Sequence, residues 1–398
     1  MTQWPRRSFL AAPAAALANN SEWDNLASAF PVDRAIANFN HAGVGTTPTP
    51  VADAVLKRMW EGEKLAPGTI FSYAPELEKV RTSLAQLASC DSEEIAIVRN
   101  ATEALDAVLL GFPLRGGDEV ITTSLDYWAM LDALQQRQER DGAVIKKVDV
   151  PTVPRNMDDL LAPIERALTA RTKLILVSHP VNLNGQLFPI RRISEMAHAR
   201  GAEVVVDAAQ SFGLFPYSVK DLGCDYLGTS LHKWLMGPKG TGMLYVKRDK
   251  IEKIWPLFAS GSTKPKHDIR KFELYGTWPE TILALDAAIA FHQQVGPARK
   301  AARLRELTLR WAKAIEKYPK VELHTNTDPS MSWGIATVGI RGKSAADLRR
   351  WLYEDKKILT MDVSRRTKQF SGVRISCGLA TTEQEIDKLI AALREAAA

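Results

Sequence analysis

Lys233 lies beside His232 and ahead of the apolar residues Trp234, Leu235 and Met236 in the segment TSLHKWLMGPKG, residues 229–240. Removing an ammonium group from water costs free energy unless the group is paired or loses its proton. Lys233 therefore either extends its amine to solvent or is a neutral amine needed for chemistry. A neutral lysine can form a Schiff base with a carbonyl compound or remove a proton from carbon.

Asp207 ends a second apolar segment, VVVDAAQS. A carboxylate at the end of a buried strand must be solvated or paired with a cation. Taken alone, Asp207 is also suited to cap a following helical turn. Because Asp207 and Lys233 follow successive strands, their side chains could face one site.

Asn100, Ala101 and Thr102 lie in RNATEAL, where a strand pattern changes into a helix pattern. Backbone N–H groups and a hydroxyl at a helix N-terminus suit a bound phosphate, although a plain helix cap is equally compatible. The chain contains neither GxxxxGK[ST] nor a GxGxxG between strand and helix, which disfavours a P-loop or Rossmann nucleotide site.

The sequence thus offers four parts of one possible site. They are a phosphate cradle, an acid that can pair with a cationic ring nitrogen, a strand-end aromatic residue (Tyr127 or Trp128) and a half-buried lysine. A pyridoxal phosphate Schiff-base site requires these four parts.

The elements that must position these residues alternate between strand and helix patterns. Strands are predicted for EIAIVRN, DEVITTS, AVIKKVDV, TKLILVSH and AEVVVDAA, with single amphipathic helices between them. This order indicates a mostly parallel sheet covered on both faces. Functional residues collect at the carboxyl ends of such strands, which selects Asn100, Ser124, His179 and Asp207.

The pattern changes from about residue 279, where two long helices (roughly 279–295 and 297–318) precede shorter strands. We therefore predict an α/β fold with a large domain over 21–277 and a smaller α+β domain over 278–398. Residues 1–20 resemble a twin-arginine export signal, with PRRSFL and an Ala-Leu-Ala cleavage candidate. Without export, the protein would be cytoplasmic.

The bulk composition excludes several classes of protein. The net charge is +6, but no basic block interleaved with aromatic residues supports nucleic-acid binding. The three cysteines form no CxxC pair and the seven histidines show no HExxH spacing, so we predict neither a disulfide framework nor a metal site. No run of 18 apolar residues predicts a membrane span.

From about residue 36 to the end, the sequence resembles the class V aminotransferase-type pyridoxal phosphate enzymes of fold type I, which include cysteine desulfurases and isopenicillin N epimerase. The matching segments occur in the family's order: NFNHAGVGTTPTPV, RNATEAL, GGDEVITTSLDYWAM, LVSHPVNLNGQLFPI, VVVDAAQSFG, TSLHKWLMGPKGTGMLYV, FELYGTW and VRISCGLATTEQEID. The first and third segments are most similar to the isopenicillin N epimerase branch. The resemblance implies pyridoxal 5'-phosphate as cofactor and a homodimer with shared active sites.

The resemblance also implies how the cofactor ring is held. Lys233 matches the Schiff-base lysine, and Asp207 matches the acid paired with the pyridine nitrogen. Gln210 occupies the position that bonds the ring hydroxyl oxygen. Ala209 would pack on one face of the ring and Tyr127 on the other.

For the phosphate, the resemblance implies contacts from the side chains of Thr102, Ser230 and His232 and from the backbone N–H of Ala101. Thr277 matches a phosphate contact supplied by the partner subunit.

For the substrate, Asn182 and Arg374 match the groups that hold the carboxylate, and Asn182 also ranks among the cofactor-binding residues. A planar guanidinium can form two parallel bonds to a carboxylate. His41 is a further candidate for substrate binding.

The sequence departs from the cysteine desulfurases at the loop that bears their catalytic cysteine, which here reads MDVSRRTKQFSG. Cys377 lies three residues past Arg374 within a predicted strand, where a core position is expected. Many relatives have Tyr-Asn-Thr where this chain has Leu379-Ala380-Thr381.

The expected reaction begins at the α-carbon of an amino acid or peptide-like substrate, with epimerisation or transamination as the leading outcomes. The second acid could be His41, Tyr73, Arg365 or Arg366. A carbon–sulfur lyase is the enzymatic alternative, and a catalytically inactive cofactor-binding protein is the alternative from another class. Export would suit tailoring of a peptide secondary metabolite, such as a siderophore, in the periplasm.

Overall fold

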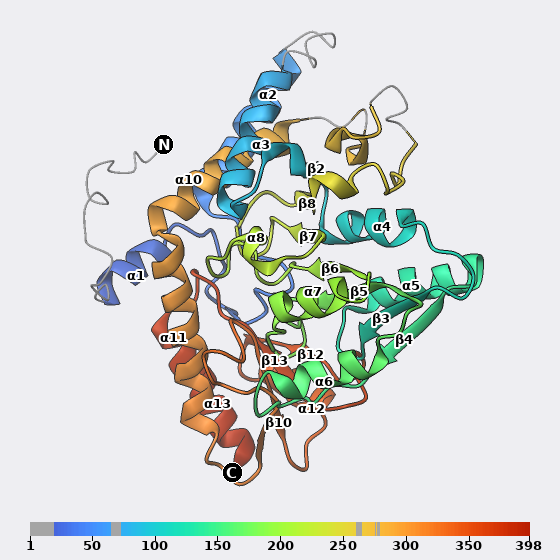
Figure 1. The fold of residues 1–398 in the computed structure, drawn as a ribbon. Coiled ribbons are helices and arrows are strands. Elements are labelled where there is room, and N and C mark those ends of the chain that lie inside the picture. Colours follow the sequence, from blue (N-terminus) through green and yellow to red (C-terminus); the bar gives the residue numbers. More distant parts are fainter. Residues whose placement is uncertain (1–19, 65–72, 260–264, 275, 277–278) are drawn as a thin grey trace.

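In the computed structural model, the described chain forms a seven-stranded sheet, a four-stranded sheet and a two-stranded sheet, with helices packed around them (Figure 1). The described residues are 20–64, 73–259, 265–274, 276 and 279–398. All but the last residue of the predicted export segment, and the predicted domain boundary between 277 and 278, lie outside the described residues. Both remain predictions.

The larger sheet has seven strands. Their spatial order is β2 (Ile95–Val98), β8 (Gly242–Val246), β7 (Tyr226–Ser230), β6 (Glu203–Asp207), β5 (Thr172–Ser178), β3 (Glu119–Thr123) and β4 (Val144–Val148). Strand β8 runs antiparallel to both of its neighbours, and every other neighbouring pair is parallel. The predicted mostly parallel sheet is confirmed.

Both faces of the central strands β5 and β6 are buried, which explains their nearly continuous apolar sequences. In β6, Val204 and Val206 pack into one apolar cluster while Val205 packs into the other. The helices supply the opposite walls. Cluster residues come from α4 (Ala101–Gly111) and α5 (Trp128–Asp141) on one face, and from α6 (Asp158–Ala167) and α7 (Ile190–His198) on the other.

The second sheet has four antiparallel strands. Their order is β12 (Met361–Asp362), β13 (Val373–Ile375), β10 (Ala336–Ile340) and β9 (Val321–Leu323). Helices α11 (Pro297–Ile315), α12 (Ala345–Glu354) and α13 (Glu383–Ala397) contribute to its apolar core. The short strand β1 (Ala37–Asn38) pairs with β11 (Ile358–Leu359), so the chain near residue 40 runs beside this C-terminal part.

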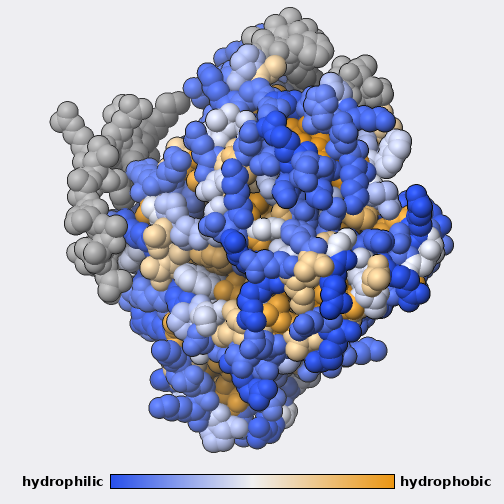
Figure 2. Space-filling view, in the orientation of Figure 1, coloured by the Kyte–Doolittle hydropathy of each residue, from blue (hydrophilic) through white to orange (hydrophobic). Residues whose placement is uncertain are grey.

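The remaining elements connect or flank these layers. They are α1 (Asn20–Ala27), α2 (Thr49–Lys64), α3 (Ala74–Ala88), η2 (Ser92–Glu94), α8 (Val219–Leu222), η3 (Arg248–Lys250), η4 (Ile269–Phe272), α9 (Glu280–Leu283) and α10 (Leu285–Val295). Helix α10 packs beside α2 and α3 (Figure 1). Hydrophilic side chains cover most of the face shown in Figure 2, with smaller apolar areas between them. Within the described ranges, no helix has the length and apolar character to cross a membrane.

Candidate active site

A cavity of about 190 Å³ opens where β5, β6 and β7 end and α4 begins. Ten of the predicted site residues line it: Ala101, Thr102, Tyr127, Asn182, Asp207, Ala209, Gln210, Ser230, His232 and Lys233. Of the four strand-end positions selected from the sequence, Asn100 and Asp207 also belong to this lining. The ring of His179 is buried against Phe215 and Tyr217 instead.

The N-terminus of α4 forms one end of the cavity. Asn100 caps this helix, since its side-chain oxygen accepts a hydrogen bond from the backbone N–H of Glu103 at 2.9 Å. The backbone N–H of Ala101 donates to the Ser230 hydroxyl at 2.9 Å. A Cβ atom on Gly242 would lie 2.6 Å from the backbone of Asn100, so only glycine permits β8 to approach here. This end combines a helix N-terminus with a hydroxyl, as a phosphate site requires.

Two buried polar atoms of the lining have no hydrogen-bond partner within the described part of the chain. They are Nδ1 of His232 and Oδ1 of Asn182. Buried polar groups usually have a hydrogen-bond partner, so we infer that a bound group supplies the partner of these two atoms. The residues present fit pyridoxal phosphate: His232 lies beside Ser230 at the α4 end, and Asn182 lies beside Arg374.

Asp207 is buried at the carboxyl end of β6. Its carboxylate accepts a hydrogen bond from the Ala209 N–H at 3.0 Å, and its carbonyl accepts one from the His179 N–H at 2.8 Å. Burial raises the pKa of Asp207, the nearby Asp126 raises it further, and Lys233 opposes this shift. A buried acid of this kind is stabilised as a carboxylate when a cationic ring nitrogen lies beside it.

Lys233 follows β7, in a turn on which the N-terminal loop packs. Gly45 donates its N–H to the carbonyl of His232 at 3.1 Å, and a Cβ atom on Gly45 would lie 2.0 Å from the Lys233 carbonyl oxygen. Burial lowers the pKa of Lys233 to about 8, and Arg374 lowers it while Asp207 raises it. About a tenth of the amine is therefore neutral at pH 7, far more than for a lysine of ordinary pKa.

Arg374, on β13, reaches the site from the C-terminal part. Its guanidinium is buried and donates to the carbonyl of Asn182 at 2.8 Å and to the side-chain oxygen of Asn40 at 2.7 Å. Its Nε has no partner, and no carboxylate in the described ranges pairs with it. Burial lowers its pKa to about 10, which leaves the guanidinium charged at neutral pH. Asn40 is not among the predicted site residues, although it lies in the segment NFNHAGVGTTPTPV.

Gln210 joins the N-terminal loop to the segment after Lys233. Its side-chain nitrogen donates to the carbonyl of Ala42 at 3.0 Å, and its oxygen accepts from Nε1 of Trp234 at 2.8 Å. One N–H of the amide remains to contact a bound ring.

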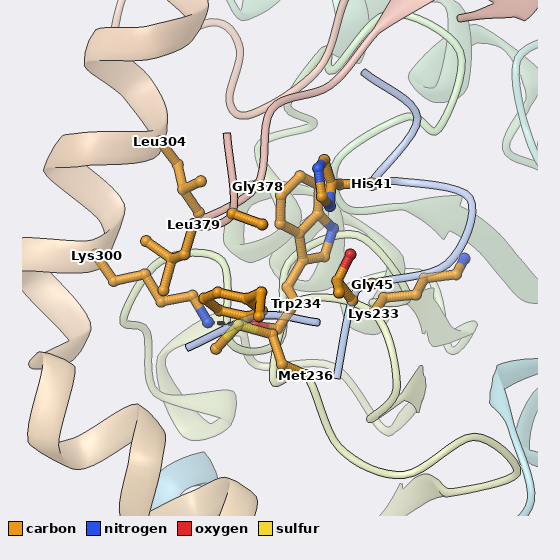
Figure 3. A pocket seen from close by; sticks show the side chains of 12 residues that line it. His41, Gly45, Lys233, Trp234, Met236, Lys300, Leu304, Gly378 and Leu379 are labelled. Carbon is orange, nitrogen blue, oxygen red and sulfur yellow. Dashed lines mark hydrogen bonds between the residues drawn. The ribbon is translucent and has the colours of Figure 1, made fainter. Parts of the chain in front are cut away.

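His41 does not lie in the lining of the cavity of about 190 Å³. It lines a second, smaller cavity of about 20 Å³ together with Trp234 and Lys300 (Figure 3). Its buried ring packs closely against Gly378, and burial lowers its pKa to about 4. In this chain the structure places His41 behind the Lys233 turn, apart from the cavity that holds the Lys233 amine.

The other predicted residues are placed less centrally. Tyr73 is buried at the start of α3, where its side chain makes no capping bond. Arg365 and Arg366 are exposed on the loop between β12 and β13. Thr277 lies outside the described residues.

The comparisons agree with this geometry. The profile of the family Aminotransferase class-V matches residues 69–389. Isopenicillin N epimerase from Streptomyces clavuligerus is 27% identical over 94% of this chain and 98% of its own. A cysteine desulfurase from Enterobacter sp. (strain 638) is 31% identical over 57% of each chain.

Two solved structures share the fold. The apo cysteine desulfurase from Thermococcus onnurineus NA1 is 22% identical with a TM-score of 0.82, covering 93% of this chain and 97% of that one. The cystine C–S lyase C-DES, in complex with its product cysteine persulfide, is 23% identical with a TM-score of 0.81, covering 91% and 97%. The chain belongs to the class V aminotransferase family and has the fold type I architecture of these pyridoxal phosphate enzymes.

Proposed function

We propose that this protein acts at the α-carbon of an amino acid or peptide-like substrate, as an epimerase or an aminotransferase. One observation supports this assignment above the others. The amine of Lys233 lies in the lined cavity, close enough to Arg374 for the guanidinium charge to lower its pKa. A carboxylate held by Arg374 would therefore place the adjacent α-carbon near Lys233.

Arg374 is oriented before any substrate arrives. Asn40 and the Asn182 carbonyl fix its plane, while its charge lacks an acidic partner within the described ranges. A substrate carboxylate would supply the missing negative charge and lower the free-energy cost of burying an unpaired cation.

Lys233 is the candidate base for the α-proton, since its pKa of about 8 leaves part of the amine neutral. When bound, pyridoxal phosphate supplies an electron sink that acidifies the Cα–H bond. Asp207, buried in the cavity lining, would support this chemistry by pairing with the cationic ring nitrogen of the bound cofactor. Besides Asp207 and Lys233, the titratable side chains of the lining are Tyr127 and His232. Because His232 lies beside Ser230 at the phosphate end, Tyr127 is the candidate second acid for epimerisation.

A carbon–sulfur lyase is the second candidate, and the missing loop cysteine counts against persulfide-forming desulfuration. Residues 361–372 contain no cysteine, and burial raises the thiol pKa of Cys90, Cys224 and Cys377. Expulsion of a β-substituent would need no thiol on the enzyme. The third candidate function is that of a protein that binds pyridoxal phosphate without catalysing a reaction.

One experiment separates these functions. The holoenzyme is incubated with candidate amino acids in deuterated water, and Cα deuterium, configuration, keto acid and sulfide are measured. Deuterium with inverted configuration and no keto acid identifies an epimerase, whereas keto acid without sulfide identifies an aminotransferase. Sulfide release identifies the lyase. A protein that binds pyridoxal phosphate but gives none of these products would contradict the proposed enzymatic function.

We further propose a homodimer with shared sites, in which Thr277 of one subunit contacts the phosphate of the other. Helix α2 supports an interface because Leu56, Met59 and Trp60 are exposed side by side at helical spacing. Light scattering tests the oligomeric state, and a monomeric holoenzyme would refute it.

Export through the twin-arginine route is likewise our proposal, based on residues 1–20. Fractionation of cells that produce the full chain tests it, with replacement of Arg6 and Arg7 by lysine as the control. Periplasmic protein that disappears in the control would support export, and purely cytoplasmic protein would exclude it.

A further inference from the structure

The loop of residues 363–370 connects β12 and β13 of the C-terminal sheet, yet it is anchored on the large domain. Val363, Thr367 and Phe370 are buried, and Val363 and Phe370 belong to the apolar cluster under one face of the seven-stranded sheet. Closing bonds fix its shape, since the N–H of Val363 donates to the Gly372 carbonyl at 3.1 Å. The loop is thus held in one place relative to the strands that bear the active site.

Gln369 fixes the position of this loop beside the cavity. Its side-chain nitrogen donates to the Ser124 hydroxyl at 2.7 Å and to Asp149 at 3.3 Å. Ser124 follows the carboxyl end of β3, three residues before Tyr127. The loop therefore lies at the same edge of the sheet as the cavity.

The buried anchors leave three cations exposed: Arg365, Arg366 and Lys368. None of them forms an ion pair with an acid of the described chain, although most exposed arginines of this protein do. Like charges without counter-ions repel one another, so their grouping on an anchored loop costs free energy. A ligand of opposite charge would repay that cost.

Arg366 stacks on Trp128, whose ring is next to a residue of the cavity lining. Its guanidinium lies 5.0 Å from the centre of the Trp128 ring, and the Trp128 and Tyr127 rings are 5.4 Å apart. Tyr127 lines the cavity. Stacking occupies one face of the guanidinium and leaves its N–H edges free for a carboxylate.

We propose that Arg366, stacked on Trp128, binds a second carboxylate at the far end of the substrate, with Arg365 and Lys368 adding positive charge. The inner guanidinium of Arg374 would hold the α-carboxylate, and the substrate would pass Tyr127 between the two. This inference rests on the proposed function and names its substrate class: dicarboxylic amino acids, free or as the acidic end of a peptide-like compound.

The test compares matched ligands that differ only in the distal carboxylate. L-Aspartate, L-glutamate, L-2-aminoadipate and L-2-aminopimelate are paired with the neutral amino acids of the same chain length. Each is titrated into the holoenzyme, and the change in the cofactor absorption band gives a dissociation constant without any need for turnover. We expect at least one diacid to bind about tenfold or more tightly than its neutral partner, as a charged hydrogen bond would give.

Variants locate the source of this preference. Arg366→Gln and Trp128→Leu should abolish it, and Arg366→Lys should keep part of it. Arg200→Gln is the matched control, since Arg200 is an exposed arginine at the opposite edge of the sheet, before β6 begins. Because Arg366 is exposed, salt should weaken the preference.

Equal affinity within every pair would overturn the inference, and so would a preference that survives Arg366→Gln and Trp128→Leu. The Cα deuterium assay distinguishes this from failure of the proposed function. Preference without exchange would support the carboxylate site and contradict the enzymatic assignment. Exchange without preference would do the reverse.

Discussion

Two lysines with little contact with solvent, the half-buried Lys233 and the buried Lys300, lie on opposite sides of the same turn, and only Lys233 has reactive surroundings. Figure 3 shows the Lys300 side chain extending from α11 toward Trp234, while the Lys233 amine points away from that cavity. Burial lowers the pKa of both, to about 8 for Lys233 and about 7 for Lys300. A lowered pKa alone therefore does not identify a catalytic lysine.

The difference lies in what each amine contacts. Lys233 has Asp207 and Arg374 within electrostatic reach. Lys300 donates to the carbonyl of Trp234 and lies 3.4 Å from the ring nitrogen of His292, with no acid beside it in the described ranges. Lys300 thus stabilises the backbone of the turn from behind, while Lys233 faces the cavity.

Replacement of either lysine gives the largest expected contrast. Lys233→Ala should abolish the cofactor band that borohydride bleaches and lower activity by about 10²-fold to 10⁴-fold, because the base and the attachment point are both lost. Lys300→Met should keep the reducible band. If Lys233→Ala retained that band, or if only Lys300→Met lost it, the assignment of the two lysines would be reversed.

Asp207→Asn should lower activity by about tenfold to a hundredfold, since a charged hydrogen bond to the ring nitrogen is lost. It should also lower the pKa of Lys233, because the Asp207 carboxylate raises it. His292→Asn is the matched change next to Lys300. Since burial holds the pKa of His292 at about 3, its ring is neutral, and we expect no effect on Lys233. Equal losses of activity in both variants would contradict the distinction.

Arg374→Gln should shift the pH dependence of cofactor attachment. The amine must be neutral to attack the aldehyde of pyridoxal phosphate, so the rate of band formation in the apoenzyme should rise with pH around a midpoint near 8. Because the charge of Arg374 lowers the pKa of Lys233, its removal should move the midpoint to higher pH. Stopped-flow absorbance measures the shift, with Arg200→Gln as control. A midpoint that stays in place would show that Arg374 does not act on Lys233.

The sheet and most of the site could be predicted because both leave local signals. Strands such as β6 are continuous apolar runs, and Asp207 stands out at the end of one. In RNATEAL, a strand pattern changes into a helix pattern at Asn100, and this change likewise indicated the N-terminus of α4. These signals need only neighbours in sequence, and the parallel topology then brings the strand ends together.

Lys300 and Asn40 could not be predicted in this way, because their roles depend on contacts between distant segments. Lys300 lies on the buried face of α11, where a lysine would ordinarily mark the solvated face. Asn40 acts through Arg374, which is 334 residues away in the chain. His41 was a candidate for substrate binding and for the second acid, yet its ring lies behind the Lys233 segment.

The smallest expected effect concerns stability, and it isolates Lys300. The pKa of this lysine is about 7 in the folded protein and near 10.5 when unfolded. Between these values the unfolded chain binds more protons, so the free energy of unfolding should rise with pH, by at most about 1.4 kcal/mol per pH unit. Below pH 7 both states bind the proton and the slope vanishes.

Lys300→Met removes this contribution while keeping a side chain of similar length. Denaturant unfolding of wild type and variant between pH 6 and 10 measures the difference, in which the similar contribution of Lys233 cancels. We expect the free energy of unfolding of the wild type, minus that of the variant, to increase from pH 7 upward. This holds whatever the difference between the two proteins is at pH 6. Parallel curves would mean that Lys300 keeps its proton in the folded protein. Lys300 would then be a buried cation that donates to the Trp234 carbonyl. It would differ from Lys233 in the charge of its amine as well as in its surroundings.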